Sequence, residues 1–228
     1  MFESYTYAYL IGDLVIGFPI WLLLLYLRRD LCKEMIFAGI VLGVGALIAD
    51  PLFWQEYWRP EELNYYRAGL GNFFYGFFFS GIASVIYEEV FRKRVSVRKK
   101  HHHSLRLLFA TIFVAGGSFL FPILILKINP IYSLIASLFI VAVIILFYRK
   151  DLIWNSLFSG FAFAAISLVG FVIYQILFPG IIQAWWFLEN LSGVFILGVP
   201  LEEIVFAFTF GMAIGPMYEF LTDLKYRG

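Results

Sequence analysis

Two adjacent glutamates, Glu202 and Glu203, open an apolar segment that reads GVPLEEIVFAF. A charged side chain in a membrane helix is costly and is usually functional. Burial and mutual repulsion favour a protonated carboxyl group, which can act as a general acid. The alternative is a simple cap of the first helical turn, where the helix dipole favours negative charge. Adjacent helical residues point about 100° apart. We therefore expect one glutamate to face the bundle and the other to face the helix at 152–178 or the connection at 179–199.

Five more residues are expected near this pair. Asp13 lies about two turns into the first apolar segment, Asp50 ends the second, and Asn72 begins the third. Depth along the predicted helices puts all three in the same half of the bundle as the glutamates. We also expect Phe206 and Trp186 to line a cavity there, because aromatic faces stabilise cations by roughly 0.5–2 kcal/mol each. The sequence therefore predicts that these five residues bind an apolar substrate.

Glu88 and Glu219 form a secondary acidic set at the opposite ends of their helices. Glu219 lies about 24 Å from Glu203 along a helix that rises about 1.5 Å per residue. The two acidic sets therefore cannot act on the same atom. We expect Glu88 and Glu219 to pair with the basic connections beside them.

The chain of 228 residues is 62% hydrophobic and 14% charged, with a mean hydropathy of +0.85. A soluble domain needs more polar residues at its surface, and about 20 apolar residues suffice to span a bilayer. We expect an all-α polytopic membrane protein with seven transmembrane helices, near residues 6–27, 33–50, 69–90, 105–126, 130–148, 152–178 and 200–222. A break is expected near Pro200, because one helix over 188–222 would run about 50 Å.

Basic residues gather on alternate connections between these helices. They are Arg28, Arg29, Lys33, Arg92, Lys93, Arg94, Arg98, Lys99, Lys100, Arg149, Lys150, Lys225 and Arg227. The positive-inside rule then predicts a multi-pass protein with its N-terminus outside and its C-terminus in the cytoplasm. The other connections, at 51–69 and 179–199, are long and rich in aromatic residues. We expect them to fold back as lids along the outer membrane surface.

The tract RKRVSVRKKHHHS (92–104) permits two interpretations. Its histidines could bind a metal and its basic run could bind nucleic acid. The alternative is a cytoplasmic loop close to anionic lipid. The alternating charge pattern favours the loop, so no nucleic-acid partner is expected.

The chain contains an internal repeat. Residues 70–88 align with 201–219 at an offset of 131 (201 minus 70), and 26–39 resemble 147–160 at an offset of 121 (147 minus 26). Each unit holds three helices, so a linker helix between them makes the two repeats parallel. The predicted division is 1–91 for the first repeat, 92–127 for the basic loop and linker helix, and 128–228 for the second repeat.

No cofactor and no metal are expected from the sequence. It shows no Gly-rich phosphate loop or dinucleotide fingerprint and no Asp-rich diphosphate–magnesium motif. Cys32 is the only cysteine, which excludes a Cys-based metal cage. The last predicted helix has no lysine in its middle, so a retinal Schiff base is not expected.

The segment around the glutamate pair resembles the integral-membrane lycopene β-cyclases, whose hallmark is Pro-(any)-Glu-Glu, then aromatics and a later Tyr-Glu. The matching residues are Pro200, Glu202, Glu203, Phe206, Tyr218 and Glu219. The resemblance implies a redox-neutral, acid-catalysed cyclisation of carotenoid ψ-ends to β-rings, an isomerase step in carotenoid biosynthesis without a cofactor. It would make Glu202 or Glu203 the acid or the base. Family members commonly carry acidic residues in both repeats, whereas Gly71–Asn72 stand in the first repeat here.

Other functions stay open at this level, including whether the chain is an enzyme. The missing first acidic pair allows a non-catalytic membrane protein of the same fold that binds an isoprenoid or carotenoid. Parallel repeats also occur in small-solute transporters, because architecture alone does not fix function. The expected partners are an apolar isoprenoid or carotenoid ligand and membrane lipids.

Overall fold

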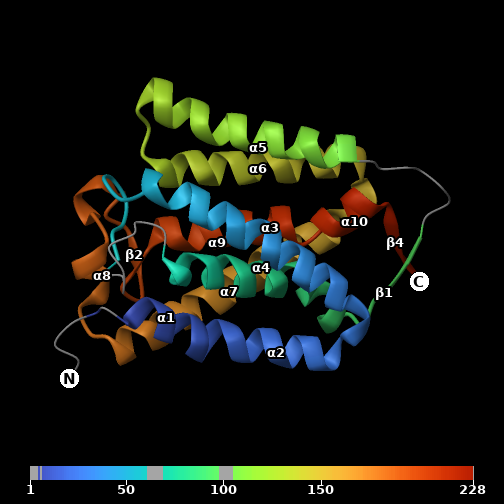
Figure 1. Cartoon of the computed structure of the whole chain (residues 1–228), viewed down its shortest axis with the longest axis horizontal. Coiled ribbons are helices and arrows are strands. Elements are labelled where there is room, and N and C mark those ends of the chain that lie inside the picture. Colours follow the sequence, from blue (N-terminus) through green and yellow to red (C-terminus); the bar gives the residue numbers. More distant parts are fainter. Residues whose placement is uncertain (1–4, 6, 61–68, 98–104, 228) are drawn as a thin grey trace.

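The protein is a bundle of long helices in the computed structural model, which describes residues 5, 7–60, 69–97 and 105–227 (Figure 1). Among these described residues, seven helical stretches are long and apolar enough to cross a membrane: Ala8–Leu27, Arg29–Leu52, Leu70–Val90, Arg106–Leu126, Pro130–Tyr148, Lys150–Leu177 and Leu201–Thr222. A helix satisfies its backbone hydrogen bonds internally, as lipid requires of a spanning segment. The prediction of an all-α polytopic protein is confirmed.

The first three spans are built from four α-helices. They are α1 (Ala8–Gly12), α2 (Phe18–Leu27), α3 (Cys32–Ala49) and α4 (Leu70–Val90). A π-helical turn, Asp13–Gly17, joins α1 to α2, and 3-10 turns at Arg29–Leu31 and Asp50–Leu52 flank α3. A π-turn inside a helix frequently marks a functional site. This one begins at Asp13, one of the predicted site residues.

The remaining spans contain five α-helices. They are α5 (Leu105–Leu126), α6 (Pro130–Tyr148), α7 (Ile153–Leu177), α9 (Leu201–Ile214) and α10 (Met217–Thr222), with a 3-10 turn at Lys150–Leu152. The expected break near Pro200 is present, and the span predicted at 200–222 is confirmed as Leu201–Thr222, although it consists of two helices. It is interrupted at Gly215–Pro216, because Pro216 has no N–H to continue the ladder. Gly215 lies close to α7: a Cβ added to Gly215 would be 2.5 Å from Ser159 Oγ.

The two ends of the bundle differ in their residues. We call one the aromatic end; it carries the connections at 50–60 and 178–200, with α8 (Ile181–Trp185), a 3-10 turn (Leu188–Asn190) and a short hairpin of β2 (Phe195–Ile196) and β3 (Val199–Pro200). The other, the arginine end, carries Arg28, Arg149 and the antiparallel pair of β1 (Arg94–Val97) and β4 (Leu224–Arg227). The N-terminus lies at the aromatic end and the C-terminus at the arginine end (Figure 1). Because α4 and α10 lead into these paired strands, both approach the arginine end.

The two aromatic connections join into one cap, here called the aromatic lid (residues 53–59 and 181–191). Trp58 and Trp186 form an antiparallel bridge. The backbone N–H of Arg59 donates to Trp185 O at 2.7 Å, and that of Phe187 donates to Tyr57 O at 2.9 Å. Segments about 130 positions apart are therefore held together over the end of the bundle.

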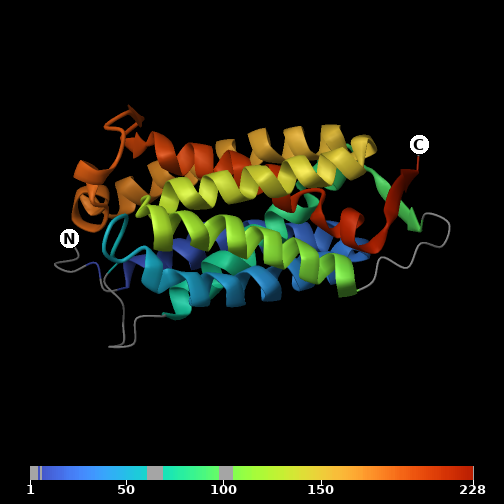
Figure 2. The same ribbon diagram turned by 90° about the horizontal axis from the view of Figure 1, so that it is seen from above.

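Helices α4 and α9 form the centre of the bundle. Two-thirds of the span Leu70–Val90 and of the span Leu201–Thr222 is buried, whereas only 6% of Arg106–Leu126 is buried. Glycines let the central helices approach their neighbours: a Cβ at Gly76 would lie 2.7 Å from Leu42 O, and one at Gly211 would lie still closer to Ser159 O. Small residues at helix contacts are typical of membrane bundles. Helix α5 lies on the outside, packed on α6 (Figure 2).

Candidate active site

Glu203 lies in the first turn of α9 and is almost fully buried, with 6% exposure. Its Oε1 accepts a hydrogen bond from the Tyr57 hydroxyl and another from Trp186 Nε1, the latter at 2.7 Å. Each donor comes from a different half of the aromatic lid. Burial raises the pKa of Tyr57, and the nearby Glu203 charge adds to the rise. The phenol therefore stays protonated near neutral pH and acts as a donor.

Glu202 turns away from Glu203. Its Oε1 accepts from the Tyr132 hydroxyl of α6 at 2.9 Å and from the backbone N–H of Ser192 at 2.7 Å. Glu202 therefore faces the connection at 179–199, which was one of its two expected partners. The helix that it contacts is α6, whereas the helix at 152–178 was expected. Its contacts stabilise the start of α9 and the chain around Ser192.

The other predicted polar residues converge on one cavity with Glu203. Asp13, Asp50 and Asn72 are each at most 4% exposed, and all line the cavity. Asn72 Oδ1 accepts from the Tyr9 hydroxyl at 2.9 Å. Within the described part of the chain, Asp13 Oδ2 has no hydrogen-bond partner. Phe206 and Trp186 also line this cavity, so six of the seven residues predicted for this site meet there; Glu202 does not.

Tyr9 occupies the space where the first repeat lacks an acidic residue. A Cβ added to Gly71 would lie 2.5 Å from Tyr9 Cδ1, so Gly71 leaves room for the tyrosine ring. Gly71 aligns with Glu202 and Asn72 with Glu203 at the offset of 131. The first repeat therefore has a tyrosine–amide hydrogen bond where the second has a carboxylate held by two donors.

The cavity is long and apolar, with a volume of about 950 Å³. One face of α9 and α10 lines it from Glu203 to Leu221, a path of about 27 Å at 1.5 Å per residue. Its aromatic residues crowd the end that holds Glu203, and they include Tyr9, Phe53, Tyr57, Trp58, Tyr75, Tyr174, Trp185 and Trp186. The charged side chains in the lining, Asp13, Asp50 and Glu203, belong to the same end. A long hydrocarbon chain would thus present one terminus to the carboxyl groups.

The cavity reaches the surface between α3 and α5. Ile48 of α3 and Ile112 of α5 line it while being 74% and 51% exposed. Gly45 and Gly116, on the same two helices, also line it, and a Cβ added to either would meet nothing within 4 Å. We call this opening the lateral entrance (Gly45, Ile48, Ile112 and Gly116). It faces the side of the bundle that lipid would cover.

The expectation that the Glu88 and Glu219 side chains pair with the basic connections stays a prediction, and the structure adds the contacts that Arg28 makes at the end of α4. Its Nη1 donates to the backbone O of Glu88 at 2.6 Å, and its Nη2 donates to Lys93 O at 2.7 Å. Its remaining bonds go to Asp30, at 3.0 and 2.9 Å. The arginine therefore binds the end of α4 through main-chain oxygens, while the Glu88 carboxyl group accepts from Asn155 at 3.0 Å.

Arg149 makes the same contacts in the other half of the chain. It donates to the backbone O of Glu219 at 3.1 Å, to Leu224 O at 2.7 Å, and to Asp151 at 2.9 and 2.8 Å. Hydrogen bonds to Asp30 and Asp151 raise the pKa of Arg28 and Arg149, respectively, so both stay charged. Arg28 and Asp30 align with Arg149 and Asp151 at the offset of 121. The carbonyl groups of Glu88 and Lys93 align with those of Glu219 and Leu224 at the offset of 131. These matched contacts support the predicted internal repeat.

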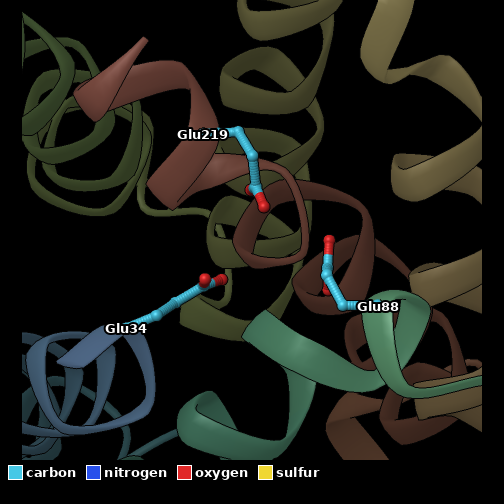
Figure 3. A group of neighbouring side chains, drawn as sticks. All are labelled: Glu34, Glu88 and Glu219. Carbon is cyan, nitrogen blue, oxygen red and sulfur yellow. The ribbon is translucent and has the colours of Figure 1, made fainter. Parts of the chain in front are cut away.

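Glu34 is a buried residue that the sequence alone did not single out. It lies in the first turn of α3, is 1% exposed, and stands with Glu88 and Glu219, which are fully buried. Figure 3 shows the three side chains converging from α3, α4 and α10. One carboxylate oxygen from each lies within 4.8 Å of the others. The repeat could have pointed to it, because Glu34 aligns with Asn155 at the offset of 121, and Asn155 also faces inward.

Residues 129–221 match the model of a protein family described as lycopene cyclase. The match contains α6, α7, α9 and nearly all of α10, and with them Glu202, Glu203 and Tyr132. No curated protein and no solved structure matched the chain. The resemblance inferred from the Pro-(any)-Glu-Glu segment is therefore confirmed by an independent comparison.

Proposed function

We propose, from the match of residues 129–221 to the lycopene cyclase family model, that the chain is a membrane cyclase that closes the ψ-ends of an acyclic carotenoid into β-rings. The observation that carries this proposal is the setting of Glu203. A buried carboxyl group with two fixed donors stands at the aromatic end of a long apolar cavity. A polyene has no polar group for recognition, so a cavity must match its long shape and the reactive end that it accepts.

Glu203 is the acid in this proposal. Its Oε1 already accepts two hydrogen bonds, so the proton of the acid form lies on Oε2. Transfer of this proton to the terminal double bond leaves a carbocation, which the neighbouring double bond attacks to close a six-membered ring. Loss of a proton from the ring then forms the ring double bond. One proton enters and one leaves, so no redox partner is required.

Aromatic faces and a second carboxyl group complete the site. Tyr75, Trp186 and Phe206 line the cavity beside Glu203 and would stabilise a cation by roughly 0.5–2 kcal/mol each. Asp13 lines the same end, and its Oδ2 has no hydrogen-bond partner among the residues described. We assign Asp13 as the base that removes the ring proton.

Expression in lycopene-producing cells tests the proposal. Pigment analysis should show new β- or γ-carotene with the natural chain. Glu203→Gln should lower product formation by about 10²- to 10⁴-fold, the usual effect of losing a general acid. Glu202→Gln should keep activity within about 10-fold, because its amide oxygen can still accept from Tyr132 and Ser192 and the side chain lies outside the cavity. Lycopene left unchanged by a well-folded natural chain would refute cyclisation of that substrate.

A matched control separates acid catalysis from a general loss of charge. Glu189→Gln changes an exposed glutamate in the same lid and should leave product formation unchanged. Equal losses in Glu202→Gln and Glu203→Gln would contradict the assignment of the acid. Equal loss in Glu189→Gln would show that the assay responds to the fold rather than to the site.

One observation favours a second function, binding of an isoprenoid without turnover. Tyr9 fills the space at Gly71 where family members commonly carry an acidic residue. If both acidic pairs are needed for chemistry, the cavity would still hold the ligand. Isoprenoid that co-purifies unchanged with the natural chain would support this function. A small-solute transporter is favoured less, because the cavity lining is largely hydrocarbon.

A further inference from the structure

The arginine end contains a cluster of three buried glutamates outside the proposed active site. We call Glu34, Glu88 and Glu219 the glutamate cluster; none of them lines the long cavity. They come from α3, α4 and α10, so the cluster joins segments of both halves of the chain (Figure 3). Three ionised carboxyl groups this close repel one another strongly in a buried setting. A cation between the three carboxyl groups, or protons shared among them, would relieve this repulsion.

The two arginines at this end already have other carboxylate partners. Arg28 lies 2.9 Å from Asp30 and 3.8 Å from Glu89. Arg149 lies 2.8 Å from Asp151 and 3.4 Å from Asp223. Their remaining hydrogen bonds go to main-chain carbonyl groups. These ion pairs go to carboxylates outside the glutamate cluster, and the two arginine charges also act on Glu88 and Glu219 from a longer distance.

Glu34 supplies a second observation that points to a ligand. Its side chain is 1% exposed, and neither of its carboxylate oxygens has a hydrogen-bond partner among the residues the structure describes. Figure 3 shows its carboxylate aimed between Glu88 and Glu219. A buried polar group without a partner is costly. Such a side chain directed at two other carboxylates is what an oxygen-binding cation would satisfy.

The residue that corresponds to Glu34 in the second repeat satisfies its neighbouring carboxyl group without a cation. At the offset of 121, Glu34 corresponds to Asn155. Asn155 Nδ2 donates to Glu88 Oε1 at 3.0 Å, so an amide satisfies the carboxylate on that side. On the other side Glu34, a carboxylate, stands in the place of the donor. The amide–carboxylate hydrogen bond on one side thus corresponds to a pair of acidic side chains, Glu34 and Glu219, on the other.

We propose that the glutamate cluster binds a hard divalent cation such as Mn²⁺, Mg²⁺ or Ca²⁺. Carboxylate oxygens are the ligands these ions prefer, at about 2.0–2.6 Å. Oxygens on such an ion lie up to about 5 Å apart, which fits the spacing within 4.8 Å. The bound ion would clamp α3, α4 and α10 together at the arginine end. The sequence alone suggested no metal, because its acidic residues lie far apart along the chain.

Manganese titration of the full chain tests the site. Protein purified in detergent and stripped with EDTA is titrated with Mn²⁺ and followed by electron paramagnetic resonance. We expect saturable binding of one ion per chain and a rise in the unfolding temperature on binding. Glu34→Asn should weaken binding by at least about 10- to 100-fold. Loss of a residue that only supports a metal ligand already costs this much, and Glu34 is itself a proposed ligand. This variant copies the Asn155 side of the repeat, so it should still fold.

Two control variants separate binding at the cluster from binding to acidic side chains in general. Glu219→Gln should also weaken binding, whereas Glu89→Gln, next to the cluster on α4, should not. Absence of saturable binding by the natural chain would overturn the proposal, as would undiminished binding by Glu34→Asn. A carboxylic-acid infrared band that disappears in Glu34→Asn, without any cation binding, would instead show shared protons. None of these readouts depends on cyclase activity, so their failure leaves the proposed function untouched.

Discussion

Tyr57 donates its hydroxyl hydrogen to Glu203 across 146 positions of sequence. The contact joins the first half of the aromatic lid to the first turn of α9. Trp186 from the other half of the lid donates to the same oxygen at 2.7 Å. The lid therefore does more than cover the bundle: it fixes the carboxyl group that faces the cavity.

Tyr57→Phe should weaken both the fold and the proposed chemistry. It removes a buried donor, which costs about 1–3 kcal/mol, and we expect product formation to fall by about 10- to 100-fold. Thermal unfolding in detergent and pigment analysis measure the two effects. Because the pKa of Tyr57 is raised by burial, its hydrogen bond is intact below the ordinary tyrosine pKa and is lost only as pH rises above it. The effect of the substitution should therefore be constant between about pH 6 and 8. A loss that varies strongly over this range would contradict the donor role.

Gly71→Ala should destabilise the protein through Tyr9. The new Cβ would lie 2.5 Å from Tyr9 Cδ1, and overpacking typically costs about 1–3 kcal/mol. Gly45→Ala is the matched control, because its Cβ would meet nothing within 4 Å. Thermal unfolding should show a clear loss for the first variant and none for the second. Adding Tyr9→Leu to Gly71→Ala should recover part of the loss, since residues in contact are energetically coupled.

Filling the lateral entrance should slow substrate entry without unfolding the protein. Gly116→Phe places a large ring at a cavity-lining position where an added Cβ meets nothing within 4 Å. We expect conversion of lycopene to fall by about 10-fold or more, as for a blocked pocket. Gly117→Phe is the control: Gly117 has equal free space but does not line the cavity. Equal activity of the two variants would show that substrate enters elsewhere.

Arg28→Met and Arg149→Met should cost similar amounts of stability. Each substitution leaves two main-chain carbonyl groups and an aspartate without their charged donor. A loss of about 2–5 kcal/mol is expected for each, the range seen when one partner of a buried pair is removed. Lysine at either position should rescue little, because it lacks the planar fork. Thermal unfolding measures both losses, and a large cost at only one arginine would argue against equivalent repeats.

The orientation of the chain stays a prediction of its charge pattern. The structure puts the N-terminus and the C-terminus at opposite ends of the bundle, as seven spans require (Figure 1). Labelling of single cysteines placed in the aromatic lid and beside Arg149, in intact cells, would test which end faces the cytoplasm. Residues 98–104 of the basic, His-containing tract lie outside the described residues.

Hydropathy alone determined the seven spans and their approximate limits, because lipid accepts only long segments with internally satisfied backbones. The cost of charge in lipid likewise made Glu202 and Glu203 stand out. Only the tertiary structure decided which glutamate faces the cavity, since that depends on how α9 is rotated and where it begins. The donors Tyr57 and Trp186 lie on separate connections with no shared pattern. Glu34 meets Glu88 and Glu219 only because three helices converge at one end, and no local spacing encodes that meeting.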